Sequence, residues 1–125
     1  MMTHEFIVTK KEEIPDYTNA NYVIDVCDMQ KTRDVIIVNN DIIVNNKLFQ
    51  KGFKSFAVSF KNPSEGLDYH GMTIIPDTSI SGFQANVIKA KESTRRWKIK
   101  RQLDELIALC EKATKENLYI IHFGL

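Results

Sequence analysis

Three histidines and two cysteines are the side chains of this sequence best suited to bind a metal or act as nucleophiles. His4, His70 and His122 lie far apart, and neither an HExxH nor a CxxC motif occurs. A zinc site needs three or four nitrogen, sulfur or oxygen ligands, so this spacing predicts no metal centre, and we expect no cofactor. We expect His70, on a predicted strand, and His122 to be partly buried and hydrogen-bonded.

The two cysteines, Cys27 and Cys110, stand singly in apolar stretches. Two isolated thiols form no disulfide framework, and this usage favours a reduced, cytoplasmic protein. Cys110 falls on the apolar stripe of a predicted helix, where a thiol behaves as a small hydrophobic group. We therefore expect neither cysteine to be a nucleophile.

Paired carboxylates occur at Glu12/Glu13 and at Asp25/Asp28. Nuclease and glycosidase sites hold two carboxylates at a fixed separation, often with a lysine or a metal ion. The sequence contains no acid-x-lysine triplet, no GxSxG motif and no glycine-rich phosphate loop. These absences favour a binding protein over an enzyme.

Charge is balanced overall and segregated locally. The net charge is +1, but residues 89–101 contain seven basic residues and one acidic residue. Acidic residues gather at 12–16 and at 25–41. Such asymmetry indicates a charged surface for a partner. The alternative is that the basic segment is only the solvated turn between two helices.

Nucleic acid is one partner that the basic segment could bind. Trp97 lies within it, and an aromatic ring among cations can stack on bases while the cations bind phosphates. However, the pI of 7.8 is lower than that of a dedicated nucleic-acid-binding protein. We also expect Trp97 to pack at the start of a helix, so nucleic acid is the less favoured partner.

The length of 125 residues predicts a single domain spanning 1–125. Apolar residues make up 43% and charged residues 26%, as in typical globular proteins. No apolar run approaches the roughly twenty residues of a membrane helix. The N-terminus lacks the apolar region of a secretory signal, which again favours a cytoplasmic location.

Alternating apolar residues predict strands over 22–27, 54–60, 67–75 and 118–123. The residue types of 62–66 predict a turn, so the strands on either side should pair antiparallel.

Residues 34–44 allow two interpretations. The first is a hairpin, in which the β-branched runs 35–38 and 42–44 flank Asn39-Asn40. The alternative is a strand that ends near Val38, followed by a helix over 41–51 with Asp41 as N-cap.

After Pro76 the apolar residues no longer alternate but recur at the spacing of a helix. Asp77 or Thr78 can cap a helix whose apolar residues are Ile80, Phe83, Val87 and Ala90. A second helix is predicted over Thr94–Glu116, with an apolar stripe and with Asn117 at its end: Ile99, Leu103, Leu106, Ile107, Cys110 and Ala113. Since the strands mostly precede the helices, the fold class is α+β. We expect an antiparallel sheet, two C-terminal helices packed on one face, and a closing C-terminal strand.

The C-terminal half resembles a known family. Residues 71–79, GMTIIPDTS, follow a G-x-T-x-I-P-x-x-S pattern in which a strand leads into a helix, and 106–113 (LIALCEKA) with 119–124 (YIIHFG) extend the likeness. These segments resemble small immunity proteins of bacterial polymorphic toxin systems, including contact-dependent growth inhibition. The resemblance covers about 55 residues and no catalytic motif.

The resemblance implies a cytoplasmic protein without enzymatic activity that binds a cognate toxin domain and blocks its active site. Many such toxins are nucleases with basic clefts, which an acidic surface would complement. The candidate partner-binding residues are therefore the N-terminal acidic residues and one tyrosine, an aromatic type enriched in interfaces: Glu12, Glu13, Asp16, Tyr17, Asp25 and Asp28. Charge complementarity also leaves open a competing site, the segment 89–101 against an acidic toxin surface. Outside this family, the alternative function is a nucleic-acid-binding or regulatory module that uses 89–101.

Overall fold

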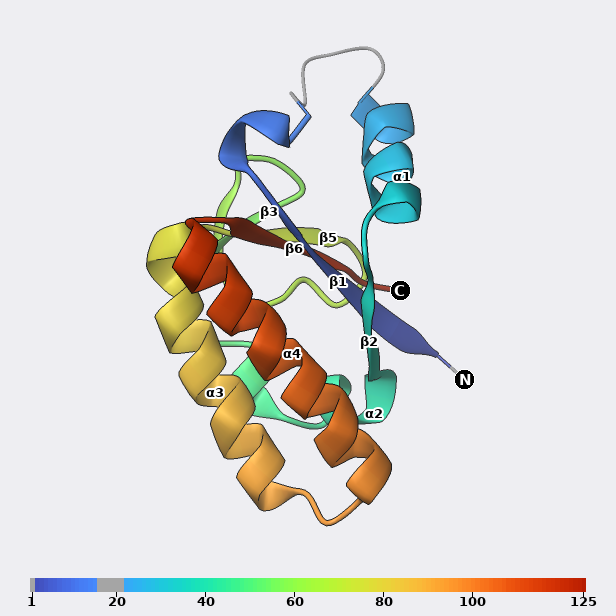
Figure 1. The fold of residues 1–125 in the computed structure, drawn as a ribbon, viewed down its shortest axis with the longest axis vertical. Helices are drawn as coiled ribbons and strands as arrows, with labels where there is room; N and C mark the ends of the chain where they lie inside the picture. Colours follow the sequence, from blue (N-terminus) through green and yellow to red (C-terminus); the bar gives the residue numbers. More distant parts are fainter. Residues whose placement is uncertain (1, 16–21) are drawn as a thin grey trace.

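The computed structural model describes residues 2–15 and 22–125, which form a six-stranded antiparallel sheet with helices on both faces (Figure 1). The strand order is β2-β1-β6-β5-β3-β4. In chain order the strands are β1 (Thr3–Thr9), β2 (Ile36–Asn39), β3 (Lys54–Ala57), β4 (Pro63–Glu65), β5 (Met72–Ile75) and β6 (Tyr119–Phe123).

Four α-helices and three short 3₁₀ helices connect these strands. The α-helices are α1 (Tyr22–Thr32), α2 (Asn40–Val44), α3 (Ile80–Ser93) and α4 (Trp97–Glu116). The 3₁₀ helices are η1 (Lys11–Glu13), η2 (Lys47–Phe49) and η3 (Asp77–Ser79). The long pair α3 and α4 covers one face of the sheet, and α1 lies against the other (Figure 1).

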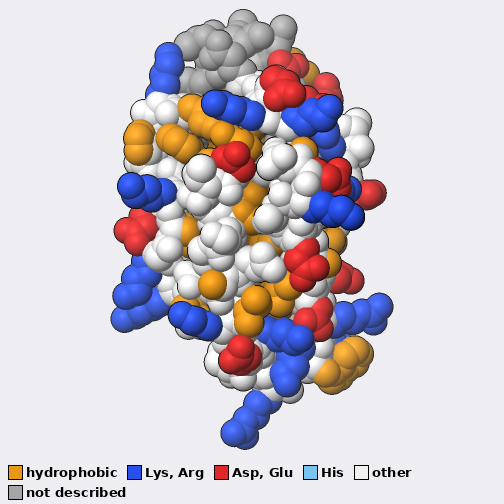
Figure 2. Space-filling model, turned by 60° about the vertical axis from the view of Figure 1, so that its left-hand side comes forward, with side chains coloured by type: hydrophobic (Ala, Val, Ile, Leu, Met, Phe, Trp, Pro, Cys, Tyr) orange, Lys and Arg blue, Asp and Glu red, His pale blue; other side chains and the backbone are white. Residues whose placement is uncertain are grey.

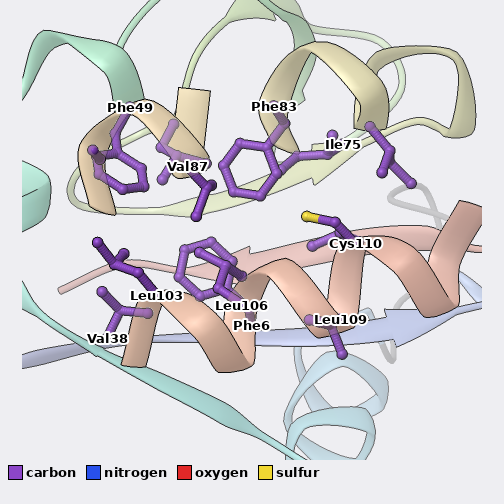
Figure 3. Close-up of a cluster of buried hydrophobic side chains, with 14 of the residues drawn as sticks. Phe6, Val38, Phe49, Ile75, Phe83, Val87, Leu103, Leu106, Leu109 and Cys110 are labelled. Atoms are coloured by element: carbon purple, nitrogen blue, oxygen red, sulfur yellow. The ribbon is translucent and has the colours of Figure 1, made fainter. Parts of the chain in front are cut away.

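The main core lies between the sheet and the pair α3–α4 (Figure 3). Successive residues of a strand point to opposite faces, so Phe6 and Ile120 enter this core. Their neighbours Ile7 and Ile121 enter a smaller cluster under α1. The predicted α+β class, the two C-terminal helices on one face and the closing strand are therefore confirmed.

β1 is a strand that the sequence analysis did not predict. It pairs with both β2 and β6, and it places Phe6 and Ile7 at 0% exposure on opposite faces. A strand buried on both faces lacks the regular apolar–polar alternation of a half-exposed one. The polar His4 and Thr9 near its ends also shorten its apolar run.

The strand predicted over 22–27 is wrong, because these residues lie in α1. Tyr22, Val26 and Met29 share one helix face and pack against the sheet. The alternation would have turned Ile24 inward, but it is 61% exposed. Residues 22–27 fit both the two-residue period of a strand and the 3.6-residue period of a helix, and contacts with the sheet favour the helix.

The hairpin predicted over 35–44 is also wrong, and the alternative of a strand followed by a helix is closer. β2 pairs with β1, and the Asn39 side chain caps α2 by accepting a hydrogen bond from the backbone N–H of Asp41 at 2.8 Å. Asp41 therefore lies inside the helix rather than capping it. The helix is also shorter than predicted over 41–51, because it ends at Val44.

The strands predicted over 54–60 and 67–75 do pair antiparallel, with Phe56 opposite Ile74. Both strands are shorter than predicted. β3 ends where Val58 adopts a left-handed φ of 69°, which turns the chain out of the sheet.

The connection between β3 and β5 differs from the predicted turn over 62–66, because it contains the edge strand β4. Gly66 follows with a φ of 72°, and a Cβ there would lie 2.1 Å from the carbonyl oxygen of Gln50. His70 lies in the turn before β5 and is exposed, so its expected place on a strand and its expected partial burial are both wrong.

The predicted C-terminal elements are confirmed, but the predicted N-cap is wrong: Asp77 and Thr78 lie in η3, and Ser79 is the N-cap of α3. The expected apolar residues of α3 are all buried, and Asn117 ends α4 with a left-handed φ of 56°. α4 begins at Trp97 instead of Thr94, and Leu109 is buried where the prediction placed Ile107, which is half-buried. The long helix thus follows its apolar stripe with a small rotation.

Candidate functional site

The predicted acidic residues meet in a groove between η1 and α1, which we call the acidic groove. Its volume is about 600 Å³. Four of its lining residues are acidic, namely Glu12, Glu13, Asp25 and Asp28. The remaining lining residues are apolar or polar with a single cation: Ile14, Pro15, Met29, Thr32 and Arg33. The groove therefore combines an anionic rim with apolar side chains.

Two elements bring these carboxylates together. β1 leads directly into η1, which carries Glu12 and Glu13. α1 carries Asp25 and Asp28 three residues apart, so they share one face of the helix. The predicted strand over 22–27 contains Asp25 but not Asp28, so only the observed helix places both carboxylates on one face.

Internal contacts occupy one of the four carboxylates. The Arg33 guanidinium lies 2.8 Å from Glu13 Oε2, and the Lys10 backbone N–H donates to Glu13 Oε1 at 3.3 Å. These contacts hold the pKa of Glu13 below its usual value. Within residues 2–15 and 22–125, the other three carboxylates of the acidic groove have no ion pair. Those three are free to meet a cationic partner.

The structure thus unites four of the six predicted partner-binding residues. The other two, Asp16 and Tyr17, lie outside the described residues. Arg33 and the apolar side chains of the groove were not among the residues predicted from the sequence. No local pattern marks Arg33 for that role, since its position depends on where α1 ends against η1.

The basic segment 89–101 forms the end of the molecule where α3 connects to α4. Lys and Arg side chains protrude from this end in Figure 2. Residues 89–93 end α3, 94–96 connect the two helices, and 97–101 begin α4. Only part of the segment is therefore the solvated turn of the alternative interpretation. Trp97, however, is 66% exposed, which corrects the expectation that it packs at the helix start. The inward stripe of α4 begins two residues later, at Ile99.

A second polar cluster is fully buried under the helices. His4 Nδ1 lies 2.7 Å from His122 Nε2, and both side chains are 0% exposed. His4 Nε2 contacts Asn40 Oδ1 at 2.9 Å, and His122 Nδ1 contacts the Thr73 hydroxyl at 3.2 Å. The expectation that His122 is buried and hydrogen-bonded is confirmed.

The Asn40 amide oxygen, at one end of this chain of hydrogen bonds, sets the direction of each bond in it. Because an amide oxygen only accepts, His4 Nε2 donates to Asn40, and the neutral His4 ring accepts at Nδ1. His122 Nε2 then donates to His4, and Thr73 donates to His122 Nδ1. Burial lowers the pKa of both histidines, that of His122 to about 3. The pair is thus neutral and structural, with no access for a substrate.

The two cysteines should differ sharply in reactivity. Cys27 is exposed, whereas Cys110 is buried and desolvation raises its pKa to about 12. A thiol reagent such as Ellman's reagent should label one thiol per native chain and two after denaturation. Cys27→Ser should abolish the native labelling while Cys110→Ser leaves it unchanged. Rapid labelling of both thiols in the native protein would contradict this arrangement.

Among the residues that the structure describes, no group of three His, Cys, Asp or Glu side chains is placed to hold a metal ion. No helix in these residues has the length and apolar character to span a membrane. Comparisons of the chain with protein families, with curated proteins and with solved structures found no match.

Proposed function

We propose that this chain is an immunity protein that binds a cognate toxin domain through the acidic groove and blocks its active site. The observation that carries the proposal is the convergence of Glu12, Asp25 and Asp28 in one groove, where none of the three forms an ion pair with another described residue. Three such carboxylates beside apolar side chains suit a cationic protein surface. The chain would act by binding alone.

The chemistry of the groove defines the partner. A toxin domain that acts on nucleic acid needs a basic cleft, and the acidic groove would complement it. Opposite charges would speed association and set the orientation, while Ile14 and Met29 would supply apolar contact. The bound chain would exclude the toxin's substrate from the cleft by its bulk and by its negative charge.

The family resemblance supports the same proposal from another part of the chain. Its residues lie in β5, η3, the middle of α4, and β6, which belong to the sheet and its core. The acidic groove is built from residues 12–33, outside this region. A shared framework that carries a separate binding surface would let related immunity proteins recognise different toxins.

The test is a growth-rescue assay with the protein encoded directly upstream of this chain's gene. We expect its C-terminal domain to stop growth when expressed in a bacterial host, and this chain to restore growth. Glu12→Lys combined with Asp28→Lys should abolish rescue and slow association with the purified toxin domain at least tenfold at low salt, since both side chains are exposed. Isothermal calorimetry and stopped-flow mixing give the affinity and the rate.

A matched control places two charge reversals of the same sign on α3 and α4, at residues that do not line the acidic groove. Glu92→Lys combined with Glu105→Lys changes two exposed side chains and should leave rescue intact. The proposal fails if the upstream domain is harmless. The acidic groove is the wrong surface if its charge reversals leave both rescue and association unchanged.

A further inference from the structure

We propose that the end of the molecule between α3 and α4 binds single-stranded nucleic acid, with Trp97 stacking on a base and the surrounding cations holding phosphates. We call this surface the basic end, and its members are Lys89, Lys91, Arg95, Arg96, Trp97, Lys98, Lys100 and Arg101. This inference is independent of the acidic groove.

Most cations of the basic end have no anionic partner in the described part of the chain. Lys91 Nζ lies 2.5 Å from Asp104, and Arg96 Nη1 lies 4.0 Å from Asp41. The other five form no ion pair with any described residue: Lys89, Arg95, Lys98, Lys100 and Arg101. The first turn of α4 contains no acidic residue. The unneutralised charge therefore faces solvent, where it can meet an anion.

Trp97 supplies a flat surface among these charges. It is the first residue of α4, it is 66% exposed, and Lys98 Nζ lies 5.8 Å from the centre of its ring. Because most of the indole is exposed to water, stacking on a ligand would bury apolar surface of the ring. A base that stacks on such a ring places its phosphates within reach of the flanking cations.

Other anionic partners fit the basic end less well. Membrane binding through these helices would need an exposed apolar face, but the apolar faces of α3 and α4 are buried against the sheet. An acidic peptide would satisfy the cations without using the ring face of Trp97. A single strand of nucleic acid uses both features, since each base offers a flat face and each phosphate a charge.

Trp97 is the only tryptophan of the chain, so its fluorescence reports directly on the proposed contact. We expect an oligothymidylate of about 20 nucleotides to quench this fluorescence, with a dissociation constant of about 1–100 µM at low salt. Binding should weaken steeply as salt is added. Fluorescence anisotropy of a labelled oligonucleotide measures the same binding for variants that lack the tryptophan.

Three variants separate stacking from charge. Trp97→Ala should weaken binding about tenfold, and Trp97→Phe should restore most of it, because a smaller ring still stacks. Arg95→Glu combined with Lys98→Glu should weaken binding further and reduce the magnitude of the salt slope by about 1.4. All three side chains are exposed, so thermal unfolding should be unchanged.

Two further variants separate this inference from the proposed function. Lys112→Glu with Lys115→Glu, and the acidic-groove variant Glu12→Lys with Asp28→Lys, should both retain oligonucleotide binding. The inference is overturned if about 100 µM oligonucleotide leaves Trp97 fluorescence unchanged at low salt. It is equally overturned if anionic phosphatidylglycerol vesicles or polyglutamate bind more tightly than the oligonucleotide, or if charge reversal at the basic end matches the control.

Discussion

Replacing Phe83 by alanine is expected to lower the free energy of unfolding by about 3–5 kcal/mol. Phe83 is 0% exposed on α3, and its ring lies in the core near Phe6 of β1 (Figure 3). Its ring centre lies 6.0 Å from that of Phe6 and 5.0 Å from that of Phe53. Truncation would leave a cavity between helix and sheet that close-packed neighbours cannot fill. The melting temperature should fall by roughly 10–20 °C, as measured by circular dichroism.

The control for Phe83 lies on the same helix. Ile88 is 38% exposed, so Ile88→Ala should change the free energy of unfolding by about 0.5 kcal/mol or less. Chemical denaturation of both variants gives the difference directly. A loss below about 1 kcal/mol for Phe83→Ala would mean that the contact between α3 and the sheet is not close-packed as described.

The buried pair His4–His122 is expected to make the protein less stable as pH falls below about 6.5. In the folded state burial lowers the pKa of both histidines, that of His122 to about 3, so both are neutral near pH 7. In the unfolded chain the same histidines bind protons from about pH 6.5 downward, and this protonation favours the unfolded state over the folded one. The contribution of the neutral histidines to the free energy of unfolding is therefore fully present above pH 6.5 and is lost as the pH falls toward 3.

The loss from His122 alone should reach about 2 kcal/mol at pH 5. His4 adds to it with the same sign, because burial lowers the pKa of His4, and the nearby His70 lowers it further while the hydrogen bond to Asn40 opposes the shift. The lowered pKa of the Glu13 carboxyl acts only below its usual value of 4.5, so pH 5–6.5 isolates the histidines. Urea denaturation at a series of pH values measures the effect.

Two variants assign this pH dependence to the buried pair. His70→Gln removes an exposed histidine and should leave most of the dependence in place. His122→Gln should reduce stability at pH 7 by breaking the hydrogen bonds to His4 and Thr73, and it should flatten the profile between pH 5 and 6.5. A flat profile in the unmodified protein would contradict the burial of neutral histidines.

The C-terminal half of the fold could be predicted because its signals are local and repeated. α4 carries an apolar stripe through 20 residues, and a stripe of that length fits one period only. α3 and β6 likewise follow from their spacing. The shorter segments over 22–27 and 35–44 fit more than one period, and their contacts with the sheet decided between them.

The residues of the candidate sites could likewise be predicted from the sequence only in part. The sequence alone identified the acidic residues of 12–28 and the basic segment 89–101, because charge is read directly from residue types. Only the tertiary structure placed Glu12 and Asp28 in one groove, left Trp97 exposed and brought His4 into contact with His122. Local spacing sets the period of a helix or strand, but contacts between residues 118 positions apart depend on how those elements pack.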